Sequence, residues 1–88
     1  MQIDLEKALL TALHELGELY TDAMVRCARA EHSCNMLRLH GMEEDEDFEF
    51  MEGKVTELKE KMGVLEEFTN QLKRMLKYLV FPEGEKRE

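Results

Sequence analysis

The chain has no tryptophan, one proline, and six aromatic residues among its 88. It also lacks any run of alternating apolar and polar residues of the kind that a half-buried strand needs. Leu, Glu, Lys, Met and Ala, which favour helices, are abundant instead. These features exclude a sheet-based fold and predict an all-α protein of one domain.

Positive charge is scarce. The net charge is −8, and residues 41–50 alone contribute −6. Nucleic-acid phosphates and anionic lipid headgroups would repel such a chain, so we expect no direct binding to nucleic acid or membrane. The N-terminus has no basic region followed by a long apolar stretch, and no apolar run approaches the roughly 18 residues of a membrane span. We therefore expect a cytoplasmic protein.

Cysteine is also rare, with only Cys27 and Cys34. Seven residues of helix separate their Cα atoms by roughly 10 Å, beyond the roughly 7 Å limit for a disulfide. The Cys-x2-Cys spacing of zinc sites is missing. We expect two reduced core thiols, no metal and no cofactor, in agreement with a cytoplasmic location.

Apolar and small residues recur at spacings of three and four in both halves of the chain, which predicts two coiled-coil-like helices. In the first half this seam comprises Leu5, Leu9, Ala12, Leu16, Leu19, Ala23, Cys27, Ala30, Cys34 and Leu37, with a stutter at 19, 23 and 27. In the second half it comprises Phe48, Met51, Val55, Leu58, Met62, Leu65, Thr69, Leu72, Leu76 and Leu79.

Gly41 is the expected residue after the first helix, and Pro82 ends the second at Phe81. Asp45 or Asp47 is the expected N-cap of the second helix. We predict a helix over about 3–40, an acidic turn over 41–46 and a helix over about 46–81, which make one domain over 1–81. Residues 82–88 are predicted to be a disordered polar tail.

A short turn between two long helices forces them to run antiparallel. In the resulting hairpin, Leu37 faces the neighbourhood of Met51, and Leu16 that of Leu72. The same register is expected to bring Arg26 near Glu57.

A second apolar row lies beside each seam, toward the end of the hairpin away from the turn. We predict that it forms an interface between copies of the chain, completing a four-helix bundle or a larger assembly. The alternative is a three-helix monomer, with the first helix folded back at Gly17 or near Glu31 and His32. The predicted interface residues are Leu10, Leu13, Tyr20, Met24, Val64, Phe68, Met75 and Tyr78.

The acidic turn is the candidate binding site. Capping and the helix dipole explain part of its charge, and the surplus suits a basic surface on a protein partner. A calcium-binding loop is a third interpretation of the acidic turn, but the spaced oxygen ligands and the turn glycine of an EF-hand are missing. The predicted acidic tip comprises Glu43, Glu44, Asp45, Glu46, Asp47, Phe48 and Glu49.

The segments "ELGEL" at 15–19 and "EEFTN" at 66–70 are similar to the two acidic helical motifs of the all-α nucleotide pyrophosphohydrolases of the MazG type. That family holds magnesium with Glu-x-x-Glu and Glu-x-x-Asp. The resemblance covers about ten residues and implies a magnesium site at Glu15, Glu18 and Glu67. The chain departs from the pattern in having Asn70 at the acidic position and a longer spacer.

Our leading hypothesis is a non-enzymatic protein–protein interaction module, an oligomerising acidic helical hairpin that acts as an adaptor or inhibitor of a protein partner. One alternative is a helical oligomer that sequesters a small, nucleotide-type ligand between hairpins. The other is a divergent magnesium-dependent nucleotide pyrophosphohydrolase.

Overall fold

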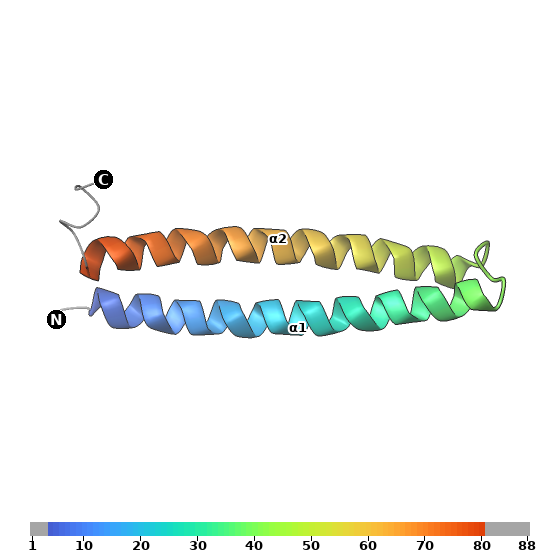
Figure 1. Ribbon diagram of the computed structural model, residues 1–88, viewed down its shortest axis with the longest axis horizontal. Helices are drawn as coiled ribbons and strands as arrows, with labels where there is room; N and C mark the ends of the chain where they lie inside the picture. Colours follow the sequence, from blue (N-terminus) through green and yellow to red (C-terminus); the bar gives the residue numbers. More distant parts are fainter. Residues whose placement is uncertain (1–3, 81–88) are drawn as a thin grey trace.

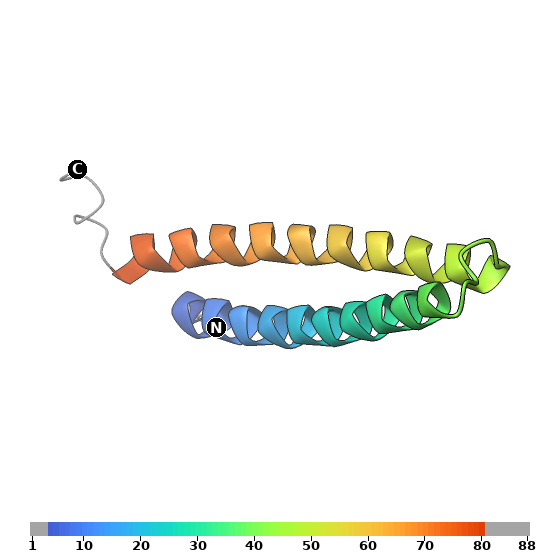
Figure 2. The same cartoon turned by 45° about the vertical axis from the view of Figure 1, so that its right-hand side comes forward.

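The computed structural model describes residues 4–80, which form two helices, α1 (Leu5–Leu39) and α2 (Glu46–Val80) (Figure 1). The helices run antiparallel and lie side by side from the turn to the open end, and a view turned by 45° shows the same arrangement (Figure 2). The predicted all-α helical hairpin is confirmed, with helix bounds within two residues of those expected. The predicted tail, 82–88, lies outside the described residues.

The three-helix alternative is wrong, because α1 is continuous through Gly17 and through Glu31 and His32. The helix begins at a side-chain cap, in which the Lys7 N–H donates to Oδ1 of Asp4 at 3.1 Å. Such a cap satisfies one of the N–H groups that the first turn leaves without a partner. Gly17 lowers the helix propensity of α1, but because the helix continues through it, Gly17 does not bend the chain back.

Gly41 ends α1 as predicted. Its φ of 69° lies in the left-handed region, which favours glycine. The Met42 N–H donates to the Leu37 carbonyl at 2.8 Å, and the Gly41 N–H to the Arg38 carbonyl at 3.0 Å. These two bonds form a Schellman motif, which satisfies the last carbonyls of the helix and reverses the chain.

Asp45 is the residue that caps α2. Its Oδ1 accepts the Asp47 N–H at 2.8 Å, and its carbonyl accepts the Phe48 N–H at 3.1 Å. Of the two candidates that the sequence offered, Asp45 is thus the N-cap and Asp47 lies in the first turn. One carboxylate of the acidic turn therefore has a structural task.

The core is a single seam between the two helices, and its buried residues all belong to the predicted heptad positions. Ala30 and Leu58 line one hollow beside the seam, and Cys34 and Val55 line another, in agreement with the expected register. The polar layer at Thr69 is satisfied within its own helix, since its hydroxyl donates to the Leu65 carbonyl at 2.8 Å. The buried residues are Leu9, Ala23, Cys27, Ala30, Cys34, Phe48 and Leu65.

The seam prediction is wrong for Leu19, which remains 48% exposed, and Leu5 and Leu79 near the helix ends are also exposed. Leu19 stands at the stutter, where a step of four residues is inserted into the heptad pattern. The insertion moves the contact line across the surface of α1, because 3.6 residues per turn do not match a repeat of 3.5. From Ala23 onward the contact line is buried again, and Leu19 lies to one side of it.

A hairpin is one layer of helices, so each helix covers only one side of the other. Within residues 4–80, fifteen large hydrophobic side chains are exposed, against seven buried apolar residues. The accessible surface is 7330 Å², whereas a compact monomer of 10.4 kDa is expected to have about 5,400 Å². The fold therefore leaves much of its apolar surface in water.

The capping geometry predicts different costs for two neighbouring substitutions. Asp45→Ala should lower the free energy of unfolding by about 1 kcal/mol, because the Asp47 N–H loses its acceptor. Asp47→Ala removes the same charge but only a favourable contact with the helix dipole, so we expect a loss of a few tenths of a kcal/mol. Urea unfolding at one protein concentration measures both, and an equal or larger loss for Asp47→Ala would contradict the assignment.

Candidate functional site

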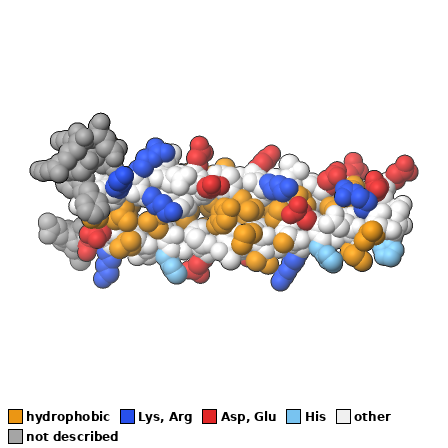
Figure 3. Space-filling view, in the orientation of Figure 1, with side chains coloured by type: hydrophobic (Ala, Val, Ile, Leu, Met, Phe, Trp, Pro, Cys, Tyr) orange, Lys and Arg blue, Asp and Glu red, His pale blue; other side chains and the backbone are white. Residues whose placement is uncertain are grey.

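The acidic tip is the turn together with the first turn of α2. Its side chains at Glu43, Glu44, Glu46, Asp47 and Glu49 are exposed, while Asp45 is half-buried. Acidic side chains gather at this end of the hairpin in the space-filling view (Figure 3). No basic residue occurs within 41–50, so the charge of −6 is not offset locally.

The two aromatic residues at the tip lie in different environments. Phe48 is 7% exposed and belongs to the seam, with the Arg38 guanidinium 5.4 Å from its ring centroid. Phe50 is 60% exposed, and Nζ of Lys54 lies 5.7 Å from its ring centroid. Phe48 thus anchors the tip to the hairpin, and the surface that the tip offers consists of carboxylates with Phe50 beside them.

The flanks of the hairpin are two distinct faces. One open hollow is lined by Arg26 of α1 together with Phe50 and Lys54 of α2. Another is lined by Glu31 of α1 and Glu52 of α2. At about 100° per residue, Glu52 is rotated by about 200° from both Phe50 and Lys54, and Glu31 by about 140° from Arg26. The two hollows therefore lie on opposite sides of the seam.

Side chains seven residues apart on a helix point in nearly the same direction. The residues that line each hollow therefore identify, in steps of seven, the other residues on the same face. On the first face, steps of seven from Lys54 reach Lys61, Phe68 and Met75. Steps of seven from Phe50 include Val64 and Tyr78. Leu58 belongs to the seam at the edge of the same hollow, and steps of seven from it pass through the buried Leu65 to Leu79, which is 44% exposed at the end of the seam. A step of seven from Arg26 reaches Leu19. We call this surface the Phe68 face; its apolar residues are Leu19, Val64, Phe68, Met75, Tyr78 and Leu79, each 44–56% exposed.

The opposite surface is apolar on α1, whereas on α2 it is charged until Val80 at the helix end, which is 45% exposed. Steps of seven from Cys34 pass through the buried Cys27 and, beyond the stutter, reach the half-buried Tyr20 and Leu13. Steps of seven from Glu31 include Met24 and Leu10. On α2, Glu52 leads to Lys59, Glu66 and Lys73, and the ion pair between Lys59 and Glu31 at 3.6 Å bridges the helices on this side. We call this surface the Tyr20 face; its apolar residues are Leu10, Leu13, Tyr20 and Met24.

The structure thus places the predicted interface residues at one end of the hairpin but on two sides. The four of α2 belong to the Phe68 face and the four of α1 to the Tyr20 face. Leu19 and Leu79 were absent from the predicted interface because the heptad pattern assigned them to the seam. Their partial exposure adds them to the Phe68 face, where Leu19 is the large apolar contribution of α1.

Ion pairs within single helices replace the expected pair between Arg26 and Glu57. Nε of Arg26 lies 2.9 Å from Oδ2 of Asp22, four residues earlier. Nζ of Lys54 lies 3.8 Å from Oε2 of Glu57, three residues later. Pairs at these spacings are neighbours on one helix and need no partner across the seam.

Glu15, Glu18 and Glu67 do not form a cluster. Glu18 instead lies beside His14, with Oε1 and Nε2 3.0 Å apart. Among residues 4–80, no group of three or more His, Cys, Asp or Glu side chains is arranged to hold a metal ion. The donor geometry that the pyrophosphohydrolase alternative needs is therefore not formed in the hairpin.

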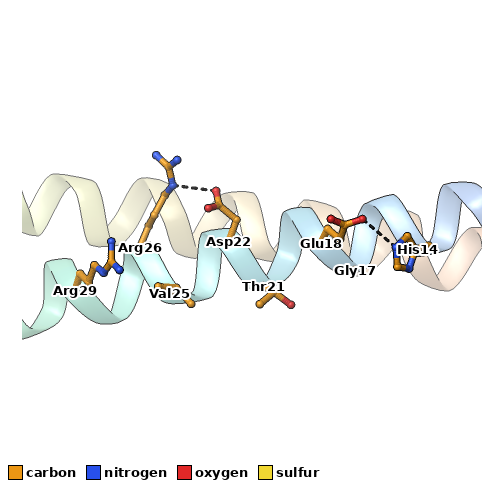
Figure 4. A pocket seen from close by; sticks show the side chains of 8 residues that line it. All are labelled: His14, Gly17, Glu18, Thr21, Asp22, Val25, Arg26 and Arg29. Atoms are coloured by element: carbon orange, nitrogen blue, oxygen red, sulfur yellow. Dashed lines mark ion pairs between the residues drawn. The ribbon is translucent and has the colours of Figure 1, made fainter.

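One open hollow lies along the outer side of α1 (Figure 4). It is lined by His14, Gly17, Glu18, Thr21, Asp22, Val25, Arg26 and Arg29. All of these residues belong to one helix, so no opposing wall encloses the space. A small ligand bound there would remain largely in water, which does not suit the enclosed, mostly apolar character of small-molecule sites.

Cys27 and Cys34 are buried, free thiols, as expected. Burial raises the pKa of the Cys27 thiol, and the Glu31 carboxylate raises it further, since Oε1 lies 3.7 Å from Sγ. A raised pKa keeps the thiol protonated and unreactive near neutral pH. Cys27 is thus a packing residue of the seam rather than a nucleophile.

Comparison with known proteins gives no relative: no family model, no curated protein and no solved structure matches the chain. Within the described part of the chain, neither helix combines the length and apolar character that crossing a membrane requires.

The raised pKa of Cys27 predicts a loss of stability at alkaline pH. The folded chain holds the thiol proton more tightly than the unfolded chain, so Cys27 has no effect while both are protonated. Stability is lost as the pH rises above the ordinary thiol pKa toward the folded value. Urea unfolding at pH 7 and at about pH 10 should show a larger loss for wild type than for Cys27→Ala. Equal losses in the two proteins would contradict this.

Proposed function

We propose that the protein is a non-enzymatic interaction module: an acidic helical hairpin that self-associates through its open end and binds a basic surface of a protein partner with its acidic tip. Through that contact it acts as an adaptor or as an inhibitor. The two buried, reduced thiols suit a reducing compartment such as the cytoplasm.

The exposed apolar surface is the observation that carries this proposal. Among residues 4–80, fifteen large hydrophobic side chains are exposed, fourteen of them on two helices that bury only one narrow seam and Met42 in the turn. Exposed apolar residues arranged in heptad rows are typical of helices that pack against further helices. A monomer with this surface would be marginal, because small domains already bury a low fraction of their surface.

The tip supports the second part of the proposal. Asp45 serves folding as a cap, and the acids of the first turn interact favourably with the helix dipole, by about 0.3–1 kcal/mol each. Glu43 and Glu44 precede the helix and have neither role. Concentrated charge at the end of a long rod favours fast encounter with an oppositely charged surface.

Self-association is tested by sedimentation equilibrium over a wide range of protein concentration. We expect an average mass above 10.4 kDa that rises with concentration, as mass action requires. A mass that stays at 10.4 kDa throughout would contradict the proposal.

Partner binding through the tip is tested with a variant that keeps the cap Asp45 and carries Gln or Asn at Glu43, Glu44, Glu46, Asp47 and Glu49. We expect it to lose partners that the wild type captures in a pull-down, with the wild-type interaction weakening as salt rises. The matched control carries Gln at five exposed glutamates elsewhere, Glu6, Glu18, Glu60, Glu66 and Glu67. Equal loss with both variants would mean that total charge, not the tip, attracts the partner.

Thermal unfolding with added ligands separates the proposal from the two alternatives. An interaction module should keep its Tm within about 1 °C in the presence of nucleotides, magnesium or both. A sequestering oligomer or a magnesium-dependent hydrolase should be stabilised by several degrees, since a ligand that binds only the folded state adds to the free energy of unfolding. A shift with any of these ligands would favour an alternative.

A further inference from the structure

We propose that a second copy of this chain docks on the Phe68 face, with the two hairpins antiparallel about a two-fold axis. The inference rests on the proposed self-association and adds which face is used, in which orientation, and which side chains meet.

The choice of face follows from what the two helices present. In a four-helix bundle made of two hairpins, both helices of one hairpin must offer apolar side chains to the other. At the open end of the Phe68 face, α2 offers Phe68 and Met75 and α1 offers Leu19. On the Tyr20 face, the α2 side carries Glu66 and Lys73 at the level of Tyr20 and Met24, and its apolar residue Val80 lies only at the helix end. Only the first face meets the requirement.

The size of the surface suits a second copy. Its six apolar side chains are each about half exposed. Since a fully exposed large side chain presents roughly 150–250 Å², they contribute on the order of 600 Å². A standard interface buries about 800 Å² on each partner, which the surrounding small and polar residues of the two helices can supply.

The row on α2 is self-complementary. Val64, Phe68, Gln71, Met75 and Tyr78 are spaced 4, 3, 4 and 3 apart, and the reversed order is 3, 4, 3 and 4. An antiparallel copy centred on Gln71 therefore aligns with the row to within one residue, about 1.5 Å along the helix. This alignment places Val64 against Tyr78 of the second copy and Phe68 against its Met75. Each pair sets a bulky aromatic residue against a smaller or more flexible one, and sulfur–aromatic contacts are favourable. An isologous interface requires such self-complementarity.

Charge selects the antiparallel orientation. A parallel pair would bring two acidic tips, each with a charge of −6, to the same end. In the antiparallel pair they lie roughly 80 Å apart, from about 27 residues of helix at 1.5 Å on each side of the axis. That distance is far beyond the Debye length of about 8 Å at physiological salt, so the tips do not repel one another.

Glu15 provides a second test of the antiparallel orientation. It lies four residues before Leu19 and three helical turns before Arg26, so it faces the same side. In the antiparallel pair α1 faces α1 of the second copy, and the two Glu15 side chains approach each other near the axis. Their repulsion weakens the pair, and its removal should strengthen it.

The test compares two substitutions that add one negative charge at similarly exposed positions on opposite faces, Phe68→Glu at 53% and Met24→Glu at 46% exposure. Sedimentation equilibrium should show the dissociation constant of the pair rising at least thirtyfold for Phe68→Glu, and by less than about threefold for Met24→Glu. Helicity by circular dichroism checks that each variant folds. Glu15→Gln should lower the dissociation constant, a gain that misfolding cannot imitate.

The outcomes separate this inference from the proposed function. A wild type that stays monomeric overturns both. A self-associating wild type in which Met24→Glu dissociates the pair and Phe68→Glu does not overturns the choice of face alone. Small-angle scattering tests the orientation: a maximum dimension of at least about 80 Å supports the antiparallel pair, and one near the 55 Å length of a single hairpin overturns it.

Discussion

The contact between α1 and α2 along a seam of small residues is the constraint on which the rest of the structure depends. Ala23, Cys27, Ala30 and Cys34 form the middle of that seam on α1. Small side chains let two helices approach closely, but each buries little apolar area, at roughly 25 cal/mol per Å². The hairpin therefore has a well-defined register and a thin core, and the large apolar side chains lie on its flanks.

The two ends of the hairpin differ in chemistry, and the antiparallel fold creates that difference. The turn gathers six carboxylates from adjacent residues, whereas the open end joins apolar rows that are some 45 residues apart in the sequence. Repulsion among the six carboxylates opposes packing at the tip. At the other end, Phe68 and Met75 present apolar surface beside Lys61 and Glu15, two charges of opposite sign. The proposed self-association and the proposed partner binding therefore use opposite ends of the hairpin and do not compete for surface.

The sequence was sufficient for the features that depend on local chemistry. Heptad spacing predicted both helices and nearly all of the seam, and Gly41 marked the Schellman turn that the structure contains. The positions it missed depend on rotation about the helix axis. The stutter moved Leu19 out of the seam. The spacing of apolar residues by three and four also does not determine on which side of the seam the second apolar row of each helix lies.

Electrostatic pairing was also beyond the sequence. The register allowed Arg26 to meet Glu57, but Asp22 lies closer, one turn away on the same helix. Pairing within a helix costs less side-chain entropy than reaching across a seam, and exposed pairs contribute little in either arrangement. Charge agreement between facing helices is therefore weaker support for a register than the spacing of apolar residues.

The placement of apolar rows on opposite faces limits how the hairpin can assemble. A pair closed through the Phe68 face by a two-fold axis leaves the Tyr20 face of each copy on the outside. Growth through that outer face would have to bury Glu66 and Lys73 beside Tyr20 and Met24, and desolvating such charges costs several kcal/mol unless each finds a partner. Apolar contact favours association on both faces, but the charged flank of α2 makes the second contact weaker. The proposed pair would therefore close into a small assembly instead of extending into a filament.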